Sequence, residues 1–92
     1  MPRVIATHGV GNMDTWLAGG AERGKIFKQF SSGYRIYRHP KDNKVAIVWE
    51  NADLEKLETV LAHPDTEKAK AKHTVREPVD IYVEIEGGEG AP

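Results

Sequence analysis

The chain has 92 residues, a formal net charge of −1 and no cysteine. A chain of this length rarely divides into two cores, so we expect one domain at residues 1–86 and a flexible, glycine-rich tail at 87–92. The lack of cysteine excludes disulfides and thiolate metal sites and favours a reducing compartment, and the nearly balanced charge argues against sequence-independent nucleic-acid binding. No apolar run approaches the roughly 20 residues of a membrane span, and the first residues lack the pattern of a secretion signal. We therefore expect a cytoplasmic protein that binds neither nucleic acid nor a membrane.

The first predicted elements are a strand and a helix. Residues 4–7 are apolar and mostly β-branched, and glycines follow at positions 9 and 11, which predicts a strand. From Trp16 to Phe27 the apolar residues recur at three- and four-residue spacing, which predicts a helix capped by Asn12 or Asp14. The glycines at 19, 20 and 24 weaken this helix. They are compatible with close packing against the sheet, with a cavity or with a kink.

A β-hairpin is predicted next. Its strands lie at residues 33–38 and 44–50, and the turn at 39–43 contains proline, aspartate and asparagine, which suit turn geometry. The strand at 44–50 is apolar on both faces, as expected in the centre of a sheet. The strand before it carries Arg35 and Arg38, as expected at a protected edge.

The last third of the chain predicts two helical segments and a strand. An apolar stripe predicts a helix at 54–61 with Asn51 as its N-cap. Pro64 ends this helix and starts a shorter one that reaches Lys72, with acidic residues at its start and lysines at its end. Residues 79–85 alternate apolar and polar side chains, which predicts the final strand.

This order of elements predicts an α+β fold, a ferredoxin-like βαββαβ domain with a four-stranded antiparallel sheet in the order 4-1-3-2. Right-handed crossovers place strands one and three in the centre, and we expect those two to run parallel to each other. Two helices cover only one face of such a sheet, yet the central strands are apolar on both faces. We therefore expect a homodimer joined through the sheet face.

The sequence resembles the small proteins of the dimeric α/β-barrel superfamily, especially unassigned members near the antibiotic-biosynthesis monooxygenases. Five short stretches carry the resemblance: residues 8–10, 14–16, 52–55, 63–64 and 77–82. The resemblance spans nearly the whole chain and implies a dimeric α/β barrel. The superfamily includes cofactor-free monooxygenases, lactone isomerases, polyketide cyclases and haem enzymes, so the fold by itself does not select a reaction.

A candidate site comes from the expected neighbourhood of the central strand ends. If strands one and three run parallel, their C-terminal ends lie together, and His8 comes near Trp49 and Glu50. Tyr34 starts the next strand at the same end, and Trp16 begins the first helix there. An apolar pocket with a few polar groups is the usual form of a small-molecule site, and a histidine beside a carboxylate suits acid–base chemistry near neutral pH.

Each of these residues also has a structural explanation. His8 could satisfy backbone groups at the end of a central strand, and both tryptophans could belong to the core. Glu50 could be a solvated residue ahead of a helix. Tyr34 and Tyr37 are expected on opposite faces of their strand, so at most one of them lines a given cavity. In the functional interpretation, His8 and Glu50 are catalytic, with His8 as the acid–base group. Trp16, Tyr34 and Trp49 contact the substrate, and Glu50 or Tyr34 orients His8.

We expect neither a metal nor a cofactor. The G-x-G at positions 9–11 has Asp14 where a dinucleotide loop requires a third glycine, and no Gly-Lys-Ser/Thr of a P-loop is present. These glycines are explained by a sharp turn from strand to helix. No H-x₃-H or H-E-x-x-H spacing occurs, which disfavours a zinc site. No histidine lies in the middle of a helix over the sheet, which disfavours haem.

Three functions remain open. The first is a small enzyme that binds an apolar or aromatic molecule and acts as a cofactor-independent monooxygenase, isomerase or cyclase. The second is a non-catalytic module that holds a metabolite in the same pocket. The third is a purely structural dimerisation module, which a closed and filled space behind His8 would favour.

Overall fold

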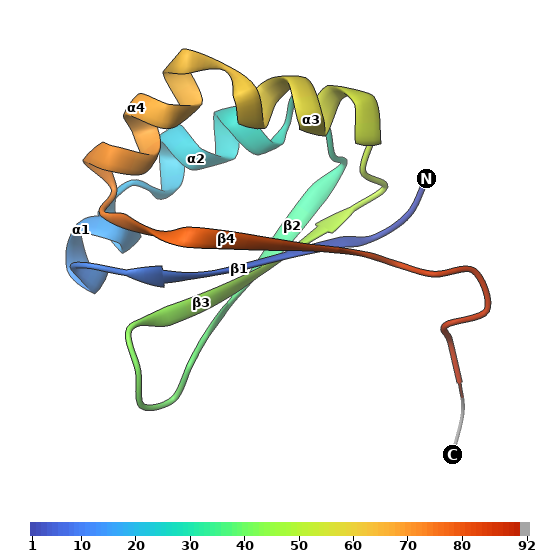
Figure 1. The fold of residues 1–92 in the computed structure, drawn as a ribbon, viewed down its shortest axis with the longest axis horizontal. Coiled ribbons are helices and arrows are strands. Elements are labelled where there is room, and N and C mark those ends of the chain that lie inside the picture. Colours follow the sequence, from blue (N-terminus) through green and yellow to red (C-terminus); the bar gives the residue numbers. More distant parts are fainter. Residues whose placement is uncertain (91–92) are drawn as a thin grey trace.

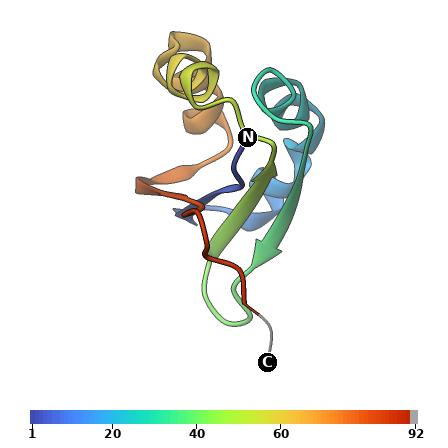
Figure 2. The same ribbon diagram turned by 90° about the vertical axis from the view of Figure 1, so that its right-hand side faces the viewer.

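The helices lie against one face of a four-stranded sheet, and the other face carries none of the described helices (Figures 1 and 2). The computed structural model describes residues 1–90; residues 91 and 92, at the end of the expected tail, lie outside the described part. No helix within residues 1–90 has the length and apolar character needed to cross a membrane. In chain order the elements are β1 (Val4–Val10), α1 (Met13–Ala18), α2 (Gly20–Phe27), β2 (Gly33–Arg38), β3 (Lys44–Glu50), α3 (Leu54–Ala62), α4 (Pro64–Lys72) and β4 (Val75–Val83).

The sheet topology confirms the predicted fold class. The strands lie side by side in the order β2-β3-β1-β4, which is the predicted order read from the other edge. Every neighbouring pair is antiparallel. The protein therefore has the α+β, ferredoxin-like architecture expected from its elements.

The expected direction of the central strands is wrong. β1 and β3 run antiparallel, with Val4 opposite Trp49 and His8 opposite Val45. The crossover through α1 and α2 returns β2 in the direction of β1, and the hairpin then reverses the chain, so β3 runs against β1. As a result, the C-terminal end of β1 lies beside the N-terminal end of β3.

The first predicted helix is divided at Gly19. This glycine ends α1 and precedes α2, with φ −83° and ψ 9°, so the chain has the kink at this position. A Cβ atom on Gly24 would lie 3.0 Å from the hydroxyl oxygen of Tyr34 on β2, so close packing against the sheet occurs as well. Asn12 caps α1 by accepting a hydrogen bond from the backbone N–H of Thr15 on its side-chain oxygen. A Cβ atom on Gly19 would lie 2.5 Å from Nε2 of His73, so only a glycine lets the end of α4 approach this kink so closely.

Two details of the second half differ from the predictions. The N-cap of α3 is Asp53, whose carboxylate accepts from the N–H of Lys56, whereas Asn51 adopts a left-handed φ of 48° where the chain leaves β3. α4 begins at Pro64, as predicted, and His63 is its N-cap, because Nδ1 of His63 accepts a hydrogen bond from the N–H of Asp65. β4 begins at Val75, four residues before the predicted start of this strand.

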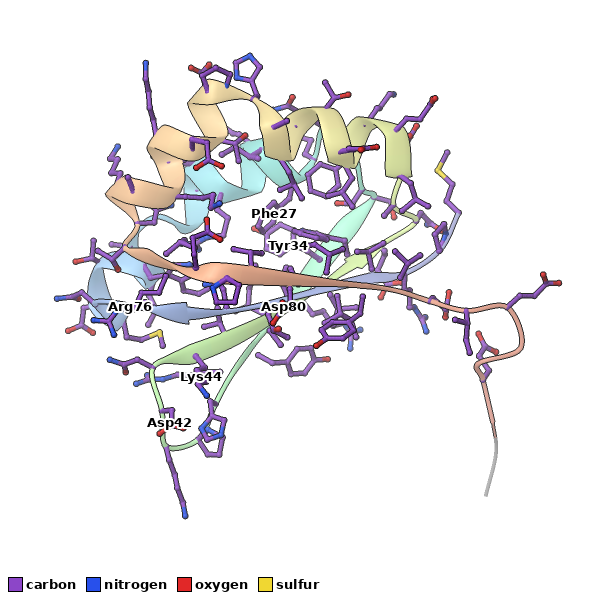
Figure 3. All side chains as sticks on the ribbon, in the orientation of Figure 1. Phe27, Tyr34, Asp42, Lys44, Arg76 and Asp80 are labelled. Carbon is purple, nitrogen blue, oxygen red and sulfur yellow. The ribbon has the colours of Figure 1, made fainter. Side chains whose placement is uncertain are left out.

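The two faces of the sheet differ in what covers them. On the helix-covered face Ile47 and Trp49 are buried, and Phe27 and Tyr34 lie on the same side (Figure 3). On the other face Ile5 is 38% exposed, Tyr37 52% and Tyr82 58%. Three large apolar side chains on one sheet face are therefore in contact with solvent in the single chain.

Candidate functional site

A cavity of about 260 Å³ lies between the helix-covered face of the sheet and the helices above it. All three of β1, β3 and β4 contribute to its floor, and α1, α2, α3 and α4 contribute to its walls. His8, Trp16 and Trp49 all line this cavity. The space behind His8 is therefore hollow.

The register of the sheet places His8 and Trp49 toward opposite ends of the cavity. Trp49 pairs with Val4, four residues before His8 on β1, which is about 13 Å along the strand. Val4 also pairs with Val83, so the Trp49 end of the cavity lies near the C-terminal end of β4. The expectation that His8 lies beside Trp49 and Glu50 is therefore wrong, and its cause is the antiparallel direction of β3.

The geometry of His8 leaves one ring nitrogen available as a base. Its Nδ1 lies 2.7 Å from the backbone oxygen of Gly9, and because a carbonyl only accepts hydrogen bonds, Nδ1 carries the proton. Within residues 1–90 no hydrogen bond involves Nε2. Burial lowers the pKa of His8 below its ordinary value of 6.5, and the charges of Arg23 and Lys70 lower it further. At neutral pH the imidazole is therefore uncharged, with its lone pair on Nε2.

Trp16 packs against both His8 and Arg23. Its ring lies 5.9 Å from the imidazole at an interplanar angle of 64°, in an edge-on contact. The guanidinium carbon of Arg23 lies 3.7 Å from the centre of the Trp16 ring, in a cation–π contact. Arg23 also donates a hydrogen bond to the backbone oxygen of Trp16. The indole thus contacts both the neutral imidazole and the buried cation.

Sequence reasoning did not identify Arg23, although a signal was present. Arg23 lies seven residues after Trp16 and four before Phe27, so it shares the helical stripe that those apolar residues define. A charged residue at a position expected to be buried is an informative exception. Arg23 is indeed only 7% exposed.

Lys70 and Glu77 complete the polar end of the cavity. Lys70 donates hydrogen bonds to Glu77 and to Glu67. Burial acts to lower the pKa of Lys70, but these two carboxylates outweigh it and raise that pKa. The same contact with Lys70 lowers the pKa of Glu77. Both groups are therefore ionised at neutral pH, and their charges offset each other.

The opposite end of the cavity is aromatic. Trp49 is 2% exposed, and its ring lies 5.1 Å from that of Phe27 and 5.0 Å from that of Phe30 in edge-on contacts. Its indole N–H is buried and has no hydrogen-bond partner within residues 1–90. Tyr34 packs edge-on against Phe27 at 5.1 Å, but it is not among the residues that line the cavity.

Glu50 is placed away from His8. Its side chain points to the opposite sheet face from Trp49, since successive residues of a strand alternate, and it accepts a hydrogen bond of 2.7 Å from Nε of Arg3. Neither Glu50 nor Tyr34 is therefore in position to orient His8, and the carbonyl of Gly9 does so instead. Within residues 1–90 no group of three metal-binding side chains comes together.

Comparison with solved structures gives the same fold. No protein-family model matches the sequence, and no curated protein matches it in sequence. The crystal structure of an antibiotic biosynthesis monooxygenase matches over all of both chains, with a TM-score of 0.68 and 17% identity. A candidate antibiotic biosynthesis monooxygenase from Bordetella bronchiseptica matches with a TM-score of 0.64 and 18% identity, over 92% of this chain and 95% of that one. Another candidate, from Deinococcus radiodurans, has a TM-score of 0.61 and 16% identity, over 100% and 97%.

These similarities confirm the expected resemblance at the level of fold. The chain has the ferredoxin-like fold found in structures described as antibiotic biosynthesis monooxygenases. Because folds of this kind support many reactions, the chemistry has to be argued from the cavity.

Proposed function

We propose that this protein binds a small apolar or aromatic molecule in the cavity, and that His8 removes a proton from the bound molecule as a general base. The observation that carries the proposal is the state of His8: a neutral imidazole whose Nδ1–H is held by the Gly9 carbonyl and whose Nε2 is free beside a cavity. A base with a pKa near or below neutral is suited to proton transfer at physiological pH.

The proposed step is simple. A proton leaves a carbon next to a carbonyl group and binds to Nε2 of His8, and the electron pair stays on the ligand as an enolate. Formation of such a carbanion is a common start for oxygenation, isomerisation or cyclisation without a cofactor. The structural neighbours described as monooxygenases make an oxygenase the favoured member of this group. An oxygenase would require dioxygen as a second substrate.

The size of the cavity limits the ligand. Sites for drug-sized molecules usually measure about 300–1,000 Å³, and this cavity of about 260 Å³ lies just below that range. A ligand of about two fused rings suits this space better than a large polyketide. The alternative functions, a non-catalytic metabolite-binding module and a structural dimerisation module, require no basic nitrogen at His8.

The proposal includes a homodimer formed through the sheet face without helices. The exposed Ile5, Tyr37 and Tyr82 supply apolar area on that face. Arg35 and Asp80 lie on the same face, since Arg35 pairs with Val48 and Asp80 with Thr7. A two-fold interface uses the same patch twice, so a patch that contains both charge signs can complement itself.

Hydrogen–deuterium exchange of a bound carbon acid tests the catalytic proposal. The probe is 2-tetralone, an aromatic ketone with acidic C–H groups, followed by NMR in D2O, while tryptophan fluorescence measures its binding. His8→Asn retains a side-chain N–H for the Gly9 carbonyl but has no basic nitrogen. We expect the wild-type protein to accelerate exchange and His8→Asn to lose about 100-fold or more of that acceleration, with fluorescence quenching retained.

The matched control is His39→Asn, which makes the same substitution at an exposed histidine of the hairpin turn. It should leave both exchange and binding unchanged. Equal exchange in wild type and His8→Asn would refute the role of His8 as a base. Quenching without any accelerated exchange in the wild type would favour the metabolite-binding module, and absence of quenching would favour the structural module.

A further inference from the structure

We infer that the ligand of this cavity is a carboxylic acid, and that Arg23 binds its carboxylate. The inference rests on the proposed small-molecule function and adds the chemical class of the ligand. Arg23 lines the cavity at the end occupied by His8 and stacks on Trp16. Charged side chains that are almost fully buried are normally paired with an opposite charge.

The guanidinium of Arg23 lacks such a pair within residues 1–90. Its one hydrogen bond there goes to the neutral carbonyl oxygen of Trp16, and its flat face rests on the Trp16 indole. The adjacent acid, Glu22, is used elsewhere, because its carboxylate pairs with Lys72 at 3.2 Å and with His73 at 3.3 Å. Most of the guanidinium N–H donors are therefore left for another partner.

The other polar groups of the cavity do not supply or require that partner. Lys70 and Glu77 are bound to each other, so their charges offset. His8 is held neutral by burial. Arg23 thus leaves one uncompensated positive charge in the cavity wall, and a planar, fixed guanidinium is the geometry that binds a carboxylate through two parallel hydrogen bonds.

The far end of the cavity indicates the rest of the ligand. Trp49 and Phe27, which are in contact with each other, give that part of the cavity an aromatic surface, and the apolar Leu61 and Ile81 also line the cavity. A ligand that fits both ends carries its carboxylate at Arg23 and directs a ring toward Trp49. The ligand class is therefore a small aromatic monocarboxylic acid.

Matched pairs of acids and amides test the inference directly. The probes are cinnamate with cinnamamide and 2-naphthoate with 2-naphthamide, which have the same shape and differ in charge. Titration calorimetry at neutral pH should show that the wild-type protein binds each acid roughly 10-fold to 100-fold more tightly than its amide. Arg23→Met should reduce this preference to about one, and Arg23→Lys should retain part of it because the charge remains but the fork is lost.

Two controls separate Arg23 from general charge effects. Lys68→Gln removes one positive charge from the exposed side of α4 and should leave the acid preference intact. Lys70→Gln removes the other cation of the cavity, and loss of the preference there but not in Arg23→Met would overturn the assignment. Circular dichroism establishes that each variant is folded, and Arg23→Lys serves if Arg23→Met is not.

The results distinguish this inference from the proposed function. If the wild type binds acids and amides equally well, the ligand class is wrong while the small-molecule function stands. An acid preference that persists in a folded Arg23 variant overturns the role of Arg23. If neither acids nor amides bind, the ligand class is refuted, and the exchange of 2-tetralone then decides the proposed function by itself.

Discussion

Gly19 offers a direct test of how the kink between α1 and α2 packs against the end of α4. An ideal Cβ on Gly19 would lie 2.5 Å from Nε2, 2.6 Å from Cε1 and 2.7 Å from Cδ2 of the His73 ring. The ring is 5% exposed and hydrogen-bonds Glu22, so it has little freedom to move away. With a φ of −83° at Gly19, the backbone itself accepts alanine, and any cost of Gly19→Ala comes from overpacking.

Gly20 provides a matched control one residue further along the chain. A Cβ there has no heavy atom within 4 Å, and Gly20 is the first residue of α2. Gly20→Ala should raise the free energy of unfolding by about 0.4–1 kcal/mol, because alanine has less freedom than glycine in the unfolded chain. Gly19→Ala has the same gain of about 0.4–1 kcal/mol but loses about 1–3 kcal/mol to overpacking, so we expect it to be less stable than Gly20→Ala by about 1–3 kcal/mol.

Urea denaturation followed by circular dichroism, at one fixed protein concentration, measures both variants. In a thermal melt of the same proteins, a change of 1 kcal/mol in the free energy of unfolding corresponds to about 4–8 °C in the melting temperature for a domain of this size. The effects of Gly19→Ala and His73→Ala should also be less than additive in a double-mutant cycle, since removal of the ring removes the clash. If Gly19→Ala proves as stable as Gly20→Ala, the close packing of His73 against the kink is refuted.

Two further predictions concern the sheet and the pH dependence of stability. Ile47→Asp, on the helix-covered face, should abolish folding because it buries an unpaired carboxylate. Val48→Asp, on the opposite face, should leave the circular dichroism spectrum unchanged and give a monomer in sedimentation. A Val48→Asp protein that is still a dimer would contradict the proposed interface. The pKa of His8 is lowered in the folded state, so the unfolded chain binds the proton first, and the free energy of unfolding should fall as the pH drops from about 6.5 through the lower folded pKa. His8→Asn should lack this fall in the free energy of unfolding. If the urea midpoints of wild type and His8→Asn change with pH in the same way between pH 7.5 and 5, the prediction is contradicted. The lowered pKa values of Glu22 and Glu77 affect the free energy of unfolding only below about pH 4.5.

Local patterns in the sequence determined the elements and, through them, the fold class. The hairpin strands at 33–38 and 44–50 have the predicted bounds, because alternating and two-faced apolar patterns follow directly from strand geometry. The turn at 39–43 and the cap at Asn12 are likewise properties of a few neighbouring residues. Successive side chains of a strand point to opposite faces of the sheet, so the sequence already indicated that Glu50 and Trp49 do not line the same site.

Contacts between distant residues decided the site. The direction of β3 relative to β1 depends on the crossover and the hairpin together, and it places Trp49 and His8 at opposite ends of the cavity instead of side by side. The proton position on His8 depends on the orientation of the Gly9 carbonyl. The importance of Arg23 depends on Trp16 lying beneath it and on Glu22 being occupied elsewhere. A sequence shows that a charge falls on an apolar stripe, but only the packed structure shows whether another side chain neutralises it.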